Sequence, residues 1–300
     1  MVHTALEEKL QQELDSLVKK NADIFNPILG IESLENDFNW IGAAGNAYAD
    51  DPLPMQDDTP FFIASITKMY TAAAVLILDE RGDLSLEDPL SKHLPGSIVS
   101  GLHVIRNRDY SDQLTIYHLI SQTSGLPDYF LGKPRQGKSF YERLITAGDF
   151  GWDVEQVVDI TKNSLVPKFP PEPAGKRQTG KQAYYTDTNY QLLGAILEAV
   201  TSKHLSEIYS DLITDRLELP NTYLHGYGKH DNMQPASIYY KTMPFHLDKA
   251  MTSFGPDGGL VSTVADSLKF LRSYLTGKLF DNPATLERIM YWKKIFFPMQ

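Results

Sequence analysis

The sequence contains no cysteine among its 300 residues. This absence excludes a disulfide framework, a thiolate metal site and a cysteine nucleophile, and it leaves the redox compartment open. Basic residues are outnumbered as well, because 28 Lys and Arg stand against 38 Asp and Glu, for a formal net charge of −10. A chain of that charge has no overall attraction to a phosphate backbone or an anionic membrane. We therefore expect neither nucleic acid nor membrane as a partner.

Long hydrophobic runs are lacking too. The longest apolar stretch, Ala72 to Leu78, is far shorter than the roughly 20 residues that a membrane-spanning helix needs. Glu7 and Glu8 stand where a signal peptide would have its apolar core. As written, the sequence predicts a cytoplasmic protein, and a mature periplasmic or secreted form would look the same. Its composition, 42% hydrophobic and 22% charged, is typical of a globular protein with one or two domains.

Apolar spacing predicts the first elements. Residues 4–20 form one amphipathic helix, and two strands, Ile28–Leu34 and Phe38–Ala44, follow with an Asn36-Asp37 turn between them. The stretch from Ser65 to Glu80 is apolar on nearly every side, which indicates a buried central helix that ends at Gly82.

The rest of the chain has helices and loops but little strand signal. The glycine-rich Gly255–Gly259 predicts a turn, and the Pro-rich Val166–Gly180 predicts a long loop. A sheet of two strands is marginal alone, so either the sheet is very small or its other strands lie beyond Gln300. The expected helices are Thr115–Ser121, Ser139–Ala147, Val154–Asn163, Thr188–Val200, Leu205–Arg216 and Thr263–Leu275.

Ser65 and Lys68 are the sharpest chemical signal. A spacing of three residues places the hydroxyl and the amine on one face of a helix. Serine becomes a nucleophile beside a base, and an amine can be that base where burial lowers its pKa. Ser65 could instead cap the helix, but a lysine in the first turn opposes the helix dipole. A catalytic pair explains the lysine better.

A second candidate is the triplet Tyr185-Thr186-Asp187, which precedes the expected Thr188–Val200 helix. The phenol could exchange protons, and the residue two positions later could bind substrate. The alternative is that Tyr185 packs and that Thr186, Asp187 or Thr188 caps the helix.

A rival motif also fits its pattern. Residues 132–139, GKPRQGKS, match the phosphate-binding pattern G-x-x-x-x-G-K-[ST]. Such a loop needs a buried strand directly before it, whereas Gly125-Leu126-Pro127-Asp128 is typical of a turn. We expect a basic surface loop here and keep nucleotide binding as a remote alternative.

Longer blocks of the sequence resemble a known family, the serine β-lactamases and penicillin-binding-protein-like hydrolases, in the class C β-lactamase-like branch. Together they cover about residues 40 to 275. The blocks are TPFFIASITKMYTAAAVLILDERGDLSLEDPLSKHLPG, LTIYHLISQTSGLPDYF, AYYTDTNYQLLGAILEAVTSKHL, LELPNTYLHG and SFGPDGGLVSTVADSLKFL.

The resemblance implies an α+β fold of the β-lactamase/transpeptidase type, an antiparallel sheet flanked by helices plus a helical region. Residues 1–62 would supply the first helix and strands, 63–250 the helical region, and 251–300 a returning helical segment. It implies that Ser65 is acylated, that Lys68 is its base partner and that Tyr185 is the second proton-transfer group. Asp187 would bind substrate, although the family usually has Asn there.

The implied activity is acyl transfer from an ester or amide, such as a β-lactam, a D-amino-acid peptide or a short-chain ester, without metal or organic cofactor. The family's third motif, Lys-Thr-Gly or His-Ser/Thr-Gly on a strand, occurs nowhere in the sequence. We expect it, with the remaining strands, beyond Gln300, and we expect this chain alone to be weakly active. A non-catalytic penicillin-binding-like protein on the same scaffold is the alternative.

Overall fold

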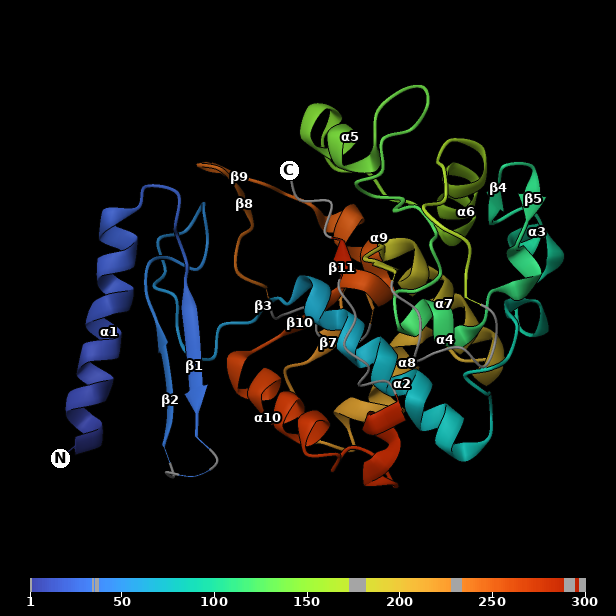
Figure 1. Ribbon diagram of the computed structural model, residues 1–300. Helices are drawn as coiled ribbons and strands as arrows, with labels where there is room; N and C mark the ends of the chain where they lie inside the picture. Colours follow the sequence, from blue (N-terminus) through green and yellow to red (C-terminus); the bar gives the residue numbers. More distant parts are fainter. Residues whose placement is uncertain are drawn as a thin grey trace.

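A two-stranded antiparallel sheet with a helix on each face forms one side of the molecule (Figure 1). The computed structural model describes residues 2–33, 35, 38–172, 182–227, 234–288 and 295–296. Strand β1 (Ile28–Glu32) pairs with β2 (Asn39–Ala43), helix α1 (Val2–Lys20) packs on β2, and α10 (Val264–Leu275) packs on β1. The two helices clamp the sheet between them.

Glycine allows α10 to approach the sheet closely. A Cβ atom at Gly30 would collide with Val264 and would lie 2.8 Å from Leu268 Cδ1. Gly42 faces the opposite side, where its Cβ would lie 2.7 Å from Gln11 Oε1 of α1. Because successive strand residues face opposite sides, these contacts place the two helices on the two faces of the sheet.

Gly30→Ala should lower the free energy of unfolding by about 1–3 kcal/mol, because the added methyl group must push α10 away from the strand. Urea unfolding followed by circular dichroism measures the change. Gly96→Ala is the matched control, since nothing lies within 4 Å of its Cβ position. Equal midpoints for the two variants would show that α10 does not press on β1.

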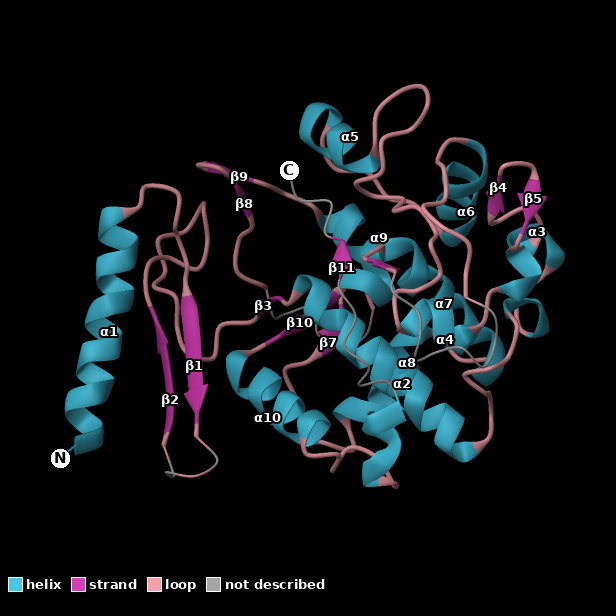
Figure 2. Cartoon of the chain, in the orientation of Figure 1, coloured by secondary structure: helices cyan, strands magenta, loops and turns pink. Residues whose placement is uncertain are grey.

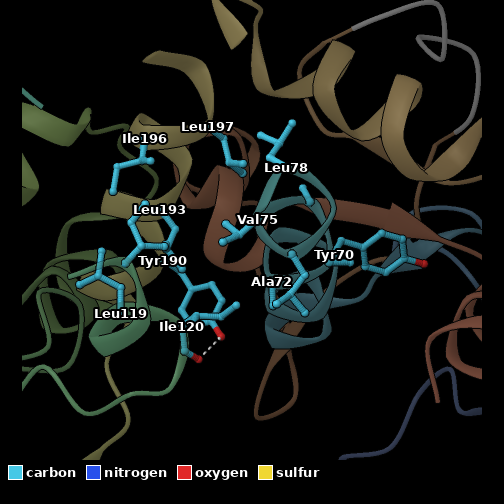
Figure 3. Close-up of a cluster of buried hydrophobic side chains, with 14 of the residues drawn as sticks. Tyr70, Ala72, Val75, Leu78, Leu119, Ile120, Tyr190, Leu193, Ile196 and Leu197 are labelled. Carbon is cyan, nitrogen blue, oxygen red and sulfur yellow. Dashed lines mark hydrogen bonds between the residues drawn. The ribbon is translucent and has the colours of Figure 1, made fainter. Parts of the chain in front are cut away.

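The larger body of the molecule is built around α2 (Thr67–Arg81), whose residues from Ala72 to Leu78 are all buried. It packs against α7 (Asp187–Thr201), α8 (Leu205–Tyr209) and α9 (Asp248–Gly258). Figure 3 shows side chains of α2 and α7 meeting in this core, where the Tyr190 hydroxyl donates to the Ile120 carbonyl of α4 (Ile116–Ile120) at 3.3 Å. Because α2 is apolar on all sides, it is stable only where other helices surround it and bury it.

The remaining elements are short, as Figure 2 shows. Strands β3 (Phe61–Phe62), β10 (Leu260–Ser262) and β7 (Tyr223–Leu224) form an antiparallel sheet in that order. Two hairpins pair β4 (Val104–Ile105) with β5 (Arg108–Asp109) and β8 (Tyr239–Tyr240) with β9 (Met243–Pro244), and β11 (Ile295–Phe296) runs parallel to β6 (Ala183–Tyr184). The other helical segments are α3 (Gly96–Val99), α5 (Phe140–Ala147), α6 (Val154–Asn163), η1 (Ala64–Ile66), η2 (Leu90–Lys92), η3 (Ser111–Gln113), the π-helical η4 (Ser210–Thr214) and η5 (Pro283–Arg288).

Most predicted elements are confirmed. The opening helix begins two residues earlier than expected, the Val154–Asn163 helix has its predicted bounds, and Gly82 adopts the left-handed conformation after α2 with φ 78°. The two early strands form and pair, while Leu34, Asn36 and Asp37 lie outside the described residues. Residues 173–180 of the expected Pro-rich loop also lie outside them.

Two predictions are wrong. Gly255–Gly259 is largely helical, because α9 continues to Gly258 across a kink at Gly255, where φ is 42° and ψ is −109°. Glycine and proline suggested a turn, but a single residue absorbs the bend. The last third of the chain also contains strands, and they are only two or three residues long, too short to show a period of two.

Candidate active site

Ser65 lies where the chain turns into the central helix. The preceding Ala64 has a positive φ of 45°, a conformation that costs a non-glycine residue energy and that is enriched at functional sites. Ser65 is exposed within η1, and no side chain caps either η1 or α2. The capping alternative for Ser65 is therefore wrong, and its hydroxyl is available for other contacts.

Two of the predicted site residues meet the Ser65 hydroxyl. Lys68 Nζ donates to Ser65 Oγ at 3.2 Å, and the Tyr185 hydroxyl donates to the same oxygen at 2.8 Å. Tyr185 stands between β6 and α7, 120 residues along the chain from Ser65. The fold thus brings together the three residues that the sequence singled out as catalytic.

Lys68 is buried, with 6% of its surface exposed, and its amine contacts three acceptors. Besides Ser65 Oγ these are the Asp257 carbonyl oxygen at 2.6 Å and Asp187 Oδ1 at 2.7 Å. The first two are hydrogen bonds of the ammonium N–H groups, and the third is an ion pair with a carboxylate. Lys68 therefore has the contacts of a cation.

The condition under which Lys68 would be a neutral base, a lowered pKa, is not met. Burial alone would favour the neutral amine, but the negative charges of Asp187 and Asp257 outweigh it and raise the pKa of Lys68 above its usual value. The sequence did not reveal this environment, because Asp257 is 189 residues away in the chain.

Asp187 begins α7 and faces Lys68. Its backbone N–H donates to Asp128 Oδ2 at 2.6 Å, and Thr186 Oγ1 accepts from the backbone N–H of Thr188 at 3.2 Å. The capping alternative is thus right for Thr186 alone. Since one oxygen of Asp187 pairs with Lys68, its predicted contact with substrate stays a prediction.

Two buried aspartates complete the site, and the sequence analysis missed both. Burial, followed by the charge of Asp187, raises the pKa of Asp128 to about 6. The same two causes raise the pKa of Asp257 well above its usual value. Each of them directly follows a proline, in a segment that was assigned to a turn. Only their place within the longer blocks LTIYHLISQTSGLPDYF and SFGPDGGLVSTVADSLKFL could have drawn attention to them.

Polar groups hold the buried Asp257 carboxyl. Asp257 Oδ2 accepts from the Tyr129 hydroxyl at 3.0 Å and from Gln191 Nε2 at 3.1 Å. The Thr71 hydroxyl of α2 donates to the neighbouring Pro256 carbonyl at 2.6 Å. These bonds fix the α9 backbone whose carbonyl contacts Lys68.

Asp257→Asn should make the protein more stable than wild type at neutral pH. Because its pKa is raised by burial, the folded protein holds the carboxyl proton to a higher pH than the unfolded chain does, so wild-type folding loses free energy as the pH rises above the unfolded pKa. The advantage of the variant should vanish near pH 4 and grow by at most about 1.4 kcal/mol per pH unit above it.

Urea unfolding at pH 4, 6 and 8 measures this difference. Asp257→Ala serves as the comparison, because it removes the acceptor for Tyr129 and Gln191 and should destabilise at every pH. A destabilisation of Asp257→Asn that is the same at all three pH values would contradict a raised pKa of this carboxyl.

In the part of the chain that the structure describes, the phosphate-binding pattern at 132–139 lacks the buried strand that such a loop needs directly before it. The described segment 121–138 contains no strand, and Ser139 caps α5 by accepting from the backbone N–H of Glu142 at 3.1 Å. The exposed Lys138 amine donates to Thr146 Oγ1 at 2.9 Å. The pattern is therefore a surface loop that leads into a capped helix.

Lys138→Ala should lower the free energy of unfolding by at most about 1 kcal/mol, the upper value for an exposed lysine contact, and should leave any hydrolytic activity within a factor of about two. Calorimetric titration with ATP checks the alternative. Micromolar ATP binding that disappears in the variant would restore the nucleotide hypothesis.

The protein has the β-lactamase/transpeptidase-like fold. Small antiparallel sheets lie beside a helical body, and Ser65 lies in η1, directly before the central helix α2. A family model described as Beta-lactamase matches residues 36–297. The chain belongs to this family, as the resemblance implied. Within the described residues, no helix is long and apolar enough to cross a membrane.

The curated relatives include penicillin-binding proteins. Penicillin-binding protein 4 of Amycolatopsis lactamdurans is 26% identical over 249 residues, which are 78% of this chain and 55% of that protein. Penicillin-binding protein 4* of Bacillus subtilis is 28% identical over 182 residues, 59% of this chain and 32% of that protein. The chain thus spans about half or less of the length of these relatives.

Solved structures share the fold at lower identity. D-amino acid amidase from Ochrobactrum anthropi SV3, complexed with L-phenylalanine, aligns with a TM-score of 0.72 and 22% identity over 98% of this chain and 76% of its own. EstCE1, a hydrolase with promiscuous acyltransferase activity, aligns with a TM-score of 0.72 and 21% identity over 95% and 77%. At such identities these structures support the fold.

Proposed function

We propose that the protein is a serine hydrolase that acts through an acyl-enzyme. The observation that carries the proposal is the contact of one exposed hydroxyl, Ser65 Oγ, with both the Lys68 amine and the Tyr185 phenol. A nucleophile held between two groups that can transfer protons is the arrangement that covalent acyl transfer requires.

In the proposed reaction, Ser65 Oγ attacks the carbonyl carbon of an ester or amide. The hydroxyl proton leaves toward the Lys68 side, and the Tyr185 phenol, which points its hydrogen at Ser65 Oγ, is placed to protonate the leaving group. Water then releases the acyl group by the reverse path. The ammonium of Lys68 also stabilises the negative charge that develops at Ser65 and the carbonyl oxygen.

The proposed substrates are small esters or amides. The structural neighbours named above include an amidase for D-amino acids and a hydrolase with acyltransferase activity, and the curated relatives are named for penicillin binding. These names support substrates in which an acyl group is bonded to oxygen, as in an ester, or to nitrogen, as in an amide. The competing proposal, a non-catalytic binder on this scaffold, is favoured by the missing K-[ST]-G or H-[ST]-G sequence.

Ser65→Ala should abolish covalent labelling by a fluorophosphonate and lower p-nitrophenyl ester hydrolysis by about 10³-fold or more, because no other group replaces the nucleophile. Intact-mass spectrometry detects the adduct and peptide mapping locates it. Ser97→Ala, an exposed serine of α3, is the control and should label like wild type. A wild-type protein that forms no adduct would favour the binder, and wild-type hydrolysis by Ser65→Ala would rule out this nucleophile.

A further inference from the structure

We infer that Asp187 is the final acceptor of the Ser65 hydroxyl proton, which reaches it through Lys68. This inference rests on the proposed hydrolase function. It gives Asp187 a task different from substrate binding, and it follows from the three contacts of the Lys68 amine.

In this arrangement the Lys68 amine has no electron pair ready to accept a proton. It donates hydrogen bonds to Ser65 Oγ and to the Asp257 carbonyl oxygen, and its nitrogen lies 2.7 Å from Asp187 Oδ1 in an ion pair. A carbonyl oxygen of the backbone cannot take up a proton at ordinary pH, whereas a carboxylate can. Asp187 is therefore the one acceptor around Lys68 that can free the amine for Ser65.

One nitrogen bridges the two ends of this path. Lys68 Nζ is 3.2 Å from Ser65 Oγ and 2.7 Å from Asp187 Oδ1. As the bond from Ser65 Oγ to the substrate carbon forms, the carbonyl π pair moves to the carbonyl oxygen. The Ser65 proton passes to Nζ while a proton of Nζ passes to Asp187. Lys68 stays an ammonium, and the negative charge moves from Asp187 to the substrate oxygen.

The surroundings of Asp187 suit this transfer. Asp128 lies against it from the loop after α4 and accepts its backbone N–H. A proton on Asp187 removes the repulsion between these two carboxylates. The other titratable groups at Lys68 are Asp257 from α9, Tyr185 before α7 and Tyr190 within α7, with Lys68 Nζ 5.2 Å and 5.7 Å from the centres of the two rings.

Tyr185 is the rival acceptor. In the described arrangement its hydroxyl donates to Ser65 Oγ, so it presents a hydrogen to the nucleophile. That geometry suits the later donation to a leaving group better than the first removal of a proton. An Asn at position 187 distinguishes Asp187 from Tyr185 as the acceptor. Asn cannot take up a proton, so it would slow acylation only if Asp187 is the acceptor.

The test is the rate of acylation between pH 5 and pH 10 in wild type and Asp187→Asn, measured by fluorophosphonate labelling and by the ester burst. We expect Asp187→Asn to lose about 10²–10⁴-fold at pH 7, the usual contribution of a proton acceptor. The loss should shrink as the pH rises, since Lys68 must then shed its own proton to solvent. Wild type should show no such alkaline recovery.

Two further variants serve as a rescue and as a control. Asp187→Glu restores a carboxylate and should recover part of the rate at pH 7. Asp159→Asn removes the same charge from an exposed residue of α6, whose carboxylate accepts from the Asn163 side chain at 2.8 Å, and should keep the wild-type profile. The ¹³Cε shift of Lys68 against pH is a readout independent of activity: its amine should deprotonate at lower pH in Asp187→Asn than in wild type.

Each remaining result has one meaning. An Asp187→Asn protein with the wild-type pH profile, or with a loss equal at every pH, overturns the inference while the hydrolase stands. Unchanged titration of Lys68 in that variant overturns it as well. Absence of any adduct on wild-type Ser65 defeats the proposed function itself, and the inference with it.

Discussion

The ion pair between Lys68 and Asp187 is the interaction on which the site depends. A buried lysine without a partner would lose its charge or destabilise the fold. Here the carboxylate at the start of α7 and the carbonyl of α9 hold the cation at the base of Ser65. Lys68 thereby joins α7 and α9 beside Ser65. The same contacts hold these helices together and position the proposed nucleophile.

Charge balance around the pair explains why so many acids can be buried close to one another. Asp128 and Asp257 have raised pKa values, each through burial first and the charge of Asp187 second. Because burial raises the pKa of Asp257, its carboxyl ionises less readily than an ordinary one, while its Oδ2 accepts hydrogen bonds from Tyr129 and Gln191. Asp187 is thus left as the carboxylate that pairs with Lys68.

Local patterns in the sequence predicted what depends on local chemistry. The central helix, its end at Gly82 and the pairing of Ser65 with Lys68 follow from side-chain spacing over a few residues, and the longer blocks added Tyr185. The state of Lys68 could not be predicted in this way, because it depends on Asp257 and on the partners that bury it. The short strands and the bent α9 were missed because their conformation is imposed by neighbours distant in the chain.

The contacts that enclose Lys68 come from three parts of the chain: the start of α2, the segment from Tyr185 into α7, and the end of α9. One of these contacts spans 189 residues. Contacts of such sequence separation form late, because long loops must close before they contribute. The polar surroundings of Ser65 therefore depend on the assembled helical body, because Lys68 gains its acceptors only where α7 and α9 reach the start of α2.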